Sequence, residues 1–207
     1  TQIYTKENTL SLHDALPIFS QGTDTGYANY TVTQQTGLTG SVTEKAITVS
    51  GITASGTQIY NGLSNVTAAF GGTAVFQASE AAGAGTTGDG KYYDVDTITL
   101  TGTPSGTFSN RNVGSGKSIT ITGISQGTGT GYANYTVTQQ TGLTGTVTAK
   151  ALTVTGSVAG ASTQVYNGTT NTAALTGTAA FQTGETAGTG TTSDGKFYTI
   201  DSIVIGG

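Results

Sequence analysis

The sequence predicts an all-β protein, and three observations support that prediction. Of its 207 residues, 33 are Gly, and charged residues make up only 9%. Thr is also abundant, and both Thr and Gly are poor helix formers. Short segments alternate apolar residues with Thr, and turn-forming dipeptides separate them. The expected architecture is an antiparallel, β-sandwich-like domain, either Ig-like or β-grasp-like.

Several segments carry the alternation, in which the apolar residue faces a core and Thr faces solvent. They are Tyr30–Thr33, Ile47–Val49, Ile98–Thr101, Ile119–Thr122, Tyr135–Thr138 and Leu152–Thr155. The β-branched Thr favours strand geometry while its hydroxyl remains hydrated. Asn61-Gly62 and Asp89-Gly90 are typical of tight turns. Residues 78–90 have no apolar period and are expected to form a long exposed loop.

Segment 1–19 differs in composition from the rest of the chain and is predicted to be non-native. It contains the chain's only His and one of its two Pro. Residues 9–18 resemble one reading frame of a common short-read sequencing adapter. Thr1–Tyr4 are the exception, because Thr57–Tyr60 repeat them and they could therefore be native.

An internal repeat organises the remaining residues. The segment from Gly26 to Gly40 recurs unchanged from Gly131 to Gly145, 105 positions later (131 minus 26). This spacing predicts the tail of one repeat at 20–44, a complete repeat at 45–149 and half of a third at 150–207. Solenoid coils repeat every 20–50 residues or so, so a unit this long is expected to bury its own core within an elongated tandem array.

The order of four motifs carries a resemblance to a known family. The motifs are Tyr60-Asn61-Gly62 (again as Tyr166-Asn167-Gly168), Asn112-Val113-Gly114-Ser115-Gly116-Lys117, Asn134-Tyr135-Thr136 and Lys150-Ala151-Leu152-Thr153-Val154. This order resembles the YDG and related MBG repeats of very large, filamentous-haemagglutinin-like bacterial exoproteins, over residues 20–207. The family motif has Asp where this chain has Asn61 and Asn167, and the Gly-rich stretch near 80–90 is a second departure. The resemblance implies an adhesin, secreted or on the bacterial outer surface, whose neighbouring repeats form a stalk.

Three carboxylates are weak candidates for a metal site. Asp89, Asp94 and Asp96 lie within eight residues, and Ca²⁺ requires several oxygen ligands. Thr199 replaces the second of them in the other copy of the repeat, and solvated carboxylates at a strand end are the alternative. No other metal and no cofactor are expected.

Two functions remain open at this point. The first is a structural stalk or spacer. The second is a module that binds host or matrix glycan or protein through the Gly-rich loops 78–92 and 183–196, with exposed Tyr rings stacking on sugars. An internal Lys–Asn isopeptide bond is a further alternative, and it requires a buried Lys45 or Lys150 beside an Asn and a carboxylate.

Composition argues against several other classes of protein. The chain has no Cys, and His13 beside Asp14 lies in the segment predicted to be non-native, so no enzyme is expected. Seven Lys and Arg form no basic stripe, which argues against nucleic-acid binding. No apolar run approaches the length of a membrane helix, so no membrane insertion is expected. No secretory signal opens the sequence, and an extracellular location is implied by the resemblance alone.

Overall fold

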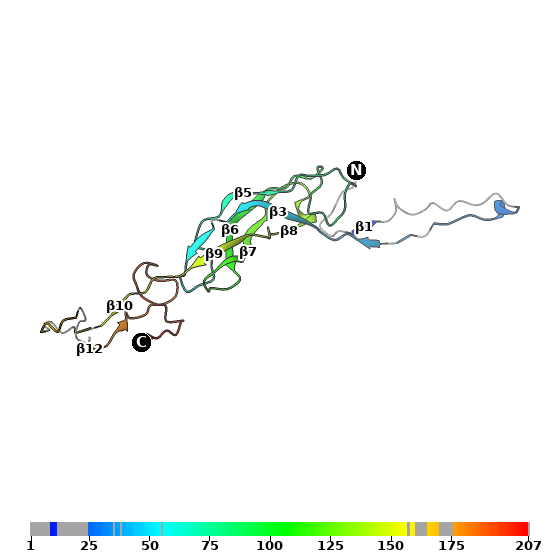
Figure 1. The fold of residues 1–207 in the computed structure, drawn as a ribbon. Helices are drawn as coiled ribbons and strands as arrows, with labels where there is room; N and C mark the ends of the chain where they lie inside the picture. The colour runs from blue at the N-terminus through cyan, green and yellow to red at the C-terminus, as the bar shows by residue number, and fades with distance from the viewer. Residues whose placement is uncertain are drawn as a thin grey trace.

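The computed structural model describes residues 9–11, 25–34, 36–37, 39–54, 56–156, 158–159, 165–169 and 176–206. These residues form strands and two short 3-10 helices, η2 (Tyr27–Asn29) and η3 (Tyr132–Asn134), which confirms the all-β prediction. Strands between residues 45 and 148 form a central body (Figure 1). The described part of the chain contains no helix that is long and apolar enough to cross a membrane.

One sheet of the body is built around β3 (Lys45–Thr53). This strand pairs with β5 (Gly71–Phe76) in antiparallel fashion and with β8 (Tyr135–Thr138) in parallel. Along β3, Ile47 and Val49 are fully buried, Thr48 between them is half-buried, and the preceding Ala46 is exposed. The predicted alternation of apolar and polar faces is therefore confirmed in this strand.

A second sheet contains four strands in the order β4-β9-β7-β6. Its members are β4 (Thr57–Ile59), β9 (Thr144–Thr148), β7 (Gly114–Gln126) and β6 (Leu100–Phe108). The pairs β6–β7 and β7–β9 are antiparallel, whereas β4 lies parallel to β9. The two parallel pairs correct the expectation of purely antiparallel sheets. Alternation reveals which face a strand buries, but it does not reveal the direction of the neighbouring strand.

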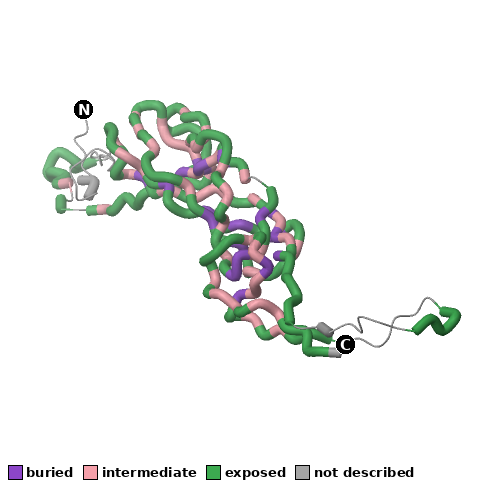
Figure 2. Tube along the Cα trace, turned by 90° about the vertical axis from the view of Figure 1, so that its left-hand side faces the viewer, coloured by how far each residue is buried: buried purple, intermediate pink, exposed green. Residues whose placement is uncertain are grey.

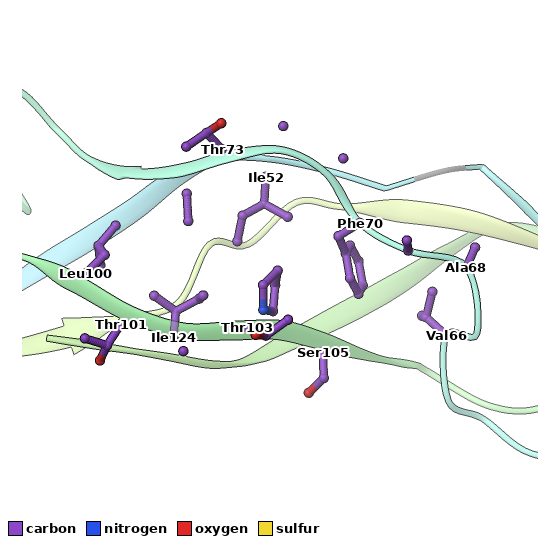
Figure 3. Close-up of a pocket in the computed structure, with 16 residues that line it drawn as sticks. Ile52, Val66, Ala68, Phe70, Thr73, Leu100, Thr101, Thr103, Ser105 and Ile124 are labelled. Atoms are coloured by element: carbon purple, nitrogen blue, oxygen red, sulfur yellow. The ribbon is translucent and has the colours of Figure 1, made fainter. Parts of the chain in front are cut away.

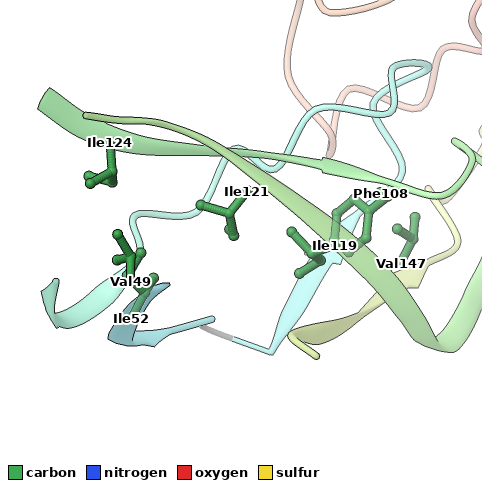
Figure 4. Packing of buried hydrophobic residues seen from close by; sticks show 7 residues of the cluster. All are labelled: Val49, Ile52, Phe108, Ile119, Ile121, Ile124 and Val147. Atoms are coloured by element: carbon green, nitrogen blue, oxygen red, sulfur yellow. The ribbon is translucent and has the colours of Figure 1, made fainter. Parts of the chain in front are cut away.

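The core lies between the two sheets, as in a sandwich. Val49 and Ile52 come from β3, and the facing residues come from β6, β7 and β9, namely Phe108, Ile119, Ile121, Ile124 and Val147 (Figure 4). Buried residues are concentrated along this central part of the chain (Figure 2). Apolar burial between two sheets is therefore what holds the body together.

Truncating a core side chain tests this assignment. The change Ile121→Ala is expected to lower the free energy of unfolding by about 2–5 kcal/mol, because it removes a buried side chain and leaves a cavity. Val75→Ala is the control, since Val75 lies on β5 and is 46% exposed. Urea denaturation followed by circular dichroism measures both, and equal losses would contradict the proposed position of the core.

One of the predicted strands does not form. Residues 30–33 are irregular, although the identical sequence at Tyr135–Thr138 forms β8. Strand β8 pairs with Lys45–Thr48, whereas no strand among the described residues pairs with residues 30–33. Pairing, and not sequence alone, thus decides whether this segment becomes a strand.

Shorter strand pairs lie on either side of the body (Figure 1). Strand β1 (Thr9–Ser11) pairs with β2 (Thr39–Ser41), β10 (Val154–Thr155) with β13 (Ala180–Phe181), and β11 (Val158–Ala159) with β12 (Thr176–Gly177). The pairing of Val154 with Phe181 reproduces that of Val49 with Phe76 at the same offset of the repeat. The second copy therefore begins the same β3–β5 pairing as the first.

Candidate functional site

Lys45 lies at the start of β3 and is the centre of a buried polar cluster. Its Nζ is 2.5 Å from Glu80 Oε1 and 3.1 Å from Asp89 Oδ1. The same ammonium lies 4.3 Å from the centroid of the Tyr93 ring. The side chains of Lys45 and Glu80 are less than one-tenth exposed, so their charges are compensated by each other and not by water. These four residues are called the Lys45 cluster below.

The strand pattern explains why Lys45 points inward. It occupies the same face of β3 as Ile47, two positions further on. The chain returns to this strand at Gly90, whose carbonyl accepts a hydrogen bond of 2.9 Å from the Thr48 N–H. A Cβ on Gly90 would lie 2.5 Å from Thr48 Oγ1, so only glycine fits this close approach. The expectation of a long exposed loop at 78–90 is therefore wrong near its ends, where Glu80 and Asp89 contact Lys45.

The second copy of the repeat contains the same cluster. Lys150 Nζ is 2.5 Å from Glu185 Oε1, 2.9 Å from Asp194 Oδ1 and 4.2 Å from the Tyr198 ring centroid. These four residues follow their counterparts by 105 positions, and they are called the Lys150 cluster. At positions between the cluster residues the two copies differ in sequence, for example at Ala81 and its counterpart Thr186, yet the cluster is complete in both.

The Lys and Asp side chains in each cluster stabilise one another's ionised forms. Burial alone lowers the pKa of Lys45 and Lys150, but hydrogen bonds to the two carboxylates outweigh this effect and hold the pKa above its ordinary value. The pKa of Asp89 lies below its usual range, and the hydrogen bond from the Lys91 backbone N–H is the largest cause. Burial alone would raise this pKa, but the Lys45 ammonium also lowers it. Lys150 is the main cause of the lowered pKa of Asp194. Each cluster is thus a stable arrangement of charged groups.

A second constellation joins residues 60–63 and Arg111 to residues 185–201, and we call it the inter-repeat contact. Tyr60 Oη donates a hydrogen bond to Asp201 Oδ2 at 2.6 Å, and its ring meets the Tyr198 ring edge-on, with centroids 5.7 Å apart. The Gly188 N–H donates to the Asn61 carbonyl at 2.8 Å. Arg111 Nη2 forms an ion pair with Asp201 Oδ1 at 3.1 Å. Residues of the predicted unit 45–149 are therefore in direct contact with the following Gly-rich segment.

The Tyr-Asn-Gly motif forms the same local turn in both copies. Asn61 Oδ1 accepts a hydrogen bond from the Leu63 N–H, and Asn167 Oδ1 accepts one from the Thr169 N–H. The glycine that follows each Asn has a φ near +80° (80° and 79°), a conformation that residues with a Cβ rarely adopt. Asn therefore serves this turn through its side-chain oxygen, as Asp would.

The surroundings of the two motif copies differ. A Cβ on Gly62 would lie 2.6 Å from the Ala187 Cβ, whereas a Cβ on Gly168 would meet nothing within 4 Å. Tyr166 is 89% exposed, while its counterpart Tyr60 packs on Tyr198. The first copy of the motif thus has a partner in the following repeat, and the second provides a matched comparison for which no such partner lies among the described residues.

Tyr135 provides a pH-dependent test of the packing around the Lys45 cluster. Its hydroxyl donates to Asp96 Oδ2 at 2.6 Å, and burial, followed by this hydrogen bond, raises its pKa to about 12 from 10.0. A raised folded-state pKa stabilises the fold fully below pH 10 and loses that contribution as the pH rises through 12. Unfolding experiments from pH 9 to 12 should show an advantage of wild type over Tyr135→Phe that falls by about 2 kcal/mol. An advantage independent of pH would contradict the assignment.

The remaining predicted site residues do not assemble into a metal site. Asp89 binds Lys45, Asp96 accepts from Tyr135, and Asp94 is exposed. Over the described ranges, no three His, Cys, Asp or Glu side chains come together as a group that could hold a metal ion. Asn112 and Gly114 lie outside both constellations, in the turn before β7 and at its first residue.

A hollow of about 530 Å³ opens at the edge of the core (Figure 3). Ile52 and Phe70 point into it from one side, and Leu100 and Ile124 from the other. All of its lining residues are uncharged. It therefore offers apolar packing and hydroxyl groups, but no titratable group for acid–base chemistry.

These features together define an all-β repeat that carries a buried lysine cluster and a Tyr-Asn-Gly turn. A comparison with protein families detects a YDG domain at residues 43–142, just under half of the chain. This span includes the whole Lys45 cluster and the first Tyr-Asn-Gly motif, and it confirms the YDG part of the resemblance inferred from the sequence. No curated protein and no solved structure matches the chain.

Sequence reasoning missed several residues of both constellations, above all Glu80, Tyr93, Arg111 and Asp201. A signal was present for the cluster, because charged residues are rare and yet Lys, Glu and Asp recur together at the offset of the repeat. The buried lysines meet one requirement of the isopeptide alternative. Their contacts are, however, two carboxylates and a Tyr ring, without the Asn that a Lys–Asn bond needs.

Proposed function

We propose that the chain is a structural stalk or spacer segment of a bacterial adhesin of the filamentous-haemagglutinin type, without catalytic activity. The protein would be secreted or displayed on the outer surface, and its main partners would be neighbouring repeats in the same chain. The single observation that carries this proposal is the inter-repeat contact, and the YDG match supports the family context.

The chain path supports a rigid connection. Strand β9 ends at Thr148, and Lys150 of the next cluster follows after the single residue Ala149. Flexible linkers require several unrestrained residues, and none separate these two structural features. The inter-repeat contact adds an ion pair, a ring contact and a backbone hydrogen bond on top of this short connection. A stiff connection of this kind suits a segment that holds a distant binding domain away from the cell.

The glycan- or protein-binding alternative is tested separately. Loops 78–92 and 183–196 would have to present side chains to a ligand, but Glu80, Asp89, Glu185 and Asp194 within them face buried lysines. The intact chain, applied to glycan arrays and to immobilised matrix proteins, is therefore expected to bind nothing. Binding that is abolished by substitutions at exposed positions of these loops would replace the spacer function with a binding function.

The genomic context tests the remaining part of the proposal. The complete reading frame is expected to contain further copies of the repeat and an export signal. Resequencing the locus is also expected to replace residues 1–19 with a continuation of the repeat. An uninterrupted native reading through codons 1–18 would contradict the adapter origin of that segment.

A further inference from the structure

The two lysine clusters contain more chemistry than a spacer requires. Each one places a primary amine, a carboxyl group and a second carboxyl group in mutual contact, with the amine and one carboxyl group almost fully buried. Burying an ion pair carries a large desolvation cost, and a packed apolar group would often serve stability as well. The arrangement nevertheless occurs twice, with the same residue types and similar distances.

We propose that each cluster forms an internal amide cross-link, in which Lys45 Nζ condenses with the Asp89 carboxyl group and Lys150 Nζ with that of Asp194. Glu80 and Glu185 transfer the proton in the respective clusters. The inference does not depend on the stalk function, since it concerns the covalent structure of the repeat.

The geometry places the reacting groups next to each other. Lys45 Nζ lies 3.1 Å from an oxygen of the Asp89 carboxyl group, and the corresponding distance from Lys150 to Asp194 is 2.9 Å. Groups held at such distances react with effective concentrations far above those in solution, up to about 10⁵–10⁸ M in well-oriented cases.

Backbone donors hold the Asp89 carboxyl group in place beside Lys45. The Lys91 N–H donates to its Oδ1 at 3.0 Å and the Thr86 N–H to its Oδ2 at 3.3 Å. Donors of this kind stabilise the negative charge that develops on oxygen when a carboxyl carbon is attacked. Asp194 receives the same pair of hydrogen bonds, from the backbone N–H groups of Lys196 and Thr191.

Glu80 is positioned for proton transfer. Its Oε1 is 2.5 Å from Lys45 Nζ, closer than Asp89, and its side chain is only 9% exposed. A carboxylate in this position can accept a proton from nitrogen and deliver it to the departing oxygen. A Gln in its place keeps the shape of the side chain but cannot carry the proton.

The reaction balances without an external reagent. An ammonium and a carboxylate yield an amide and water: one C–N bond forms, one C–O bond breaks, and two protons leave nitrogen with the oxygen. Glu80 carries both protons in turn. The first passes from the ammonium to the Asp89 carboxylate, which leaves the neutral amine that attacks. The second passes from nitrogen to the departing hydroxyl group, so Glu80 ends in its starting form. No oxidant, reductant or cofactor takes part, and a costly buried ion pair becomes a neutral amide.

Intact-mass spectrometry of the denatured full chain tests the proposal, after circular dichroism has verified that the preparation was folded. The expected mass is lower than that of the sequence by two water molecules, one for each cluster. Proteolysis should then release a branched peptide that joins Lys45 to Asp89. A folded wild-type chain with the full sequence mass would overturn the proposal.

Matched variants assign the loss to the proposed groups. Glu80→Gln and Lys45→Arg should each reduce the loss to a single water, because the untouched Lys150 cluster serves as an internal control. A cyclic imide at Asp89-Gly90 would give the same mass change, but it would persist in Lys45→Arg and would not join two peptides. A loss of two waters that persists in Lys45→Arg would therefore also overturn the proposal.

Discussion

Replacing Lys45 with Met is expected to lower the free energy of unfolding by about 3–5 kcal/mol, because the change leaves the buried Glu80 carboxylate without its Lys45 partner and releases the partly exposed Asp89. Met retains much of the apolar length of the side chain, so the loss does not come from a cavity. Any covalent bond at this position would be lost as well, which changes the result in the same direction. Urea denaturation followed by circular dichroism is the appropriate measurement.

Two further variants are needed to interpret that loss. Asp94→Asn removes a nearby exposed carboxylate and should change stability by less than about 0.5 kcal/mol. Lys45→Met combined with Glu80→Gln should recover part of the loss, because fewer uncompensated charges remain buried. If Lys45→Met alone cost no more than Asp94→Asn, the cluster would have no structural role.

Replacing Gly62 with Val is expected to disrupt the inter-repeat contact, whereas the same change at Gly168 should not. Both glycines have the same left-handed backbone conformation, so both variants carry the strain of a β-branched residue there, roughly 1–2 kcal/mol. Only at Gly62 would the new side chain also collide with Ala187. Any difference in behaviour between the two variants therefore reports the loss of the inter-repeat contact and not the strain in the turn.

Hydrogen exchange provides the readout for this pair of variants. The Gly188 N–H donates to the Asn61 carbonyl, so its protection reports whether the contact is formed. Protection should be lost in Gly62→Val and retained in Gly168→Val. Equal protection in both variants would show that the Gly188 hydrogen bond does not depend on the Tyr-Asn-Gly turn.

The strands that could be predicted are those in which the alternation of apolar and polar residues decides which side chains are buried. Ile47 and Val49 alternate with polar residues and are buried as the pattern indicates, and Ile119 and Ile121 behave in the same way. The formation of β8 could not be predicted, because the same four residues are irregular at 30–33, where no strand of the described residues pairs with them. Pairing partners that are distant in sequence are not encoded in a local period.

The two lysine clusters could be predicted only in part. Lys45 lies on the buried face of β3, and its position two residues before Ile47 in the alternating pattern could have indicated a buried lysine. Its partners could not be identified in this way, since Glu80 and Asp89 lie in a Gly-rich stretch without any period. The contact between Tyr60 and Asp201 spans 141 positions and depends on how two copies of the repeat are joined. Such contacts follow from tertiary packing and not from local sequence.

Whether consecutive repeats are held rigidly is tested most directly by a distance measured between spin labels on either side of the inter-repeat contact. The chain has no Cys, so cysteines introduced at Val75 and Val204, which are 46% and 86% exposed, can be labelled uniquely. A narrow distance distribution is predicted for the otherwise wild-type chain and for Gly168→Val, and a broad one for Gly62→Val. A broad distribution in the wild-type background would contradict a stalk built from docked repeats.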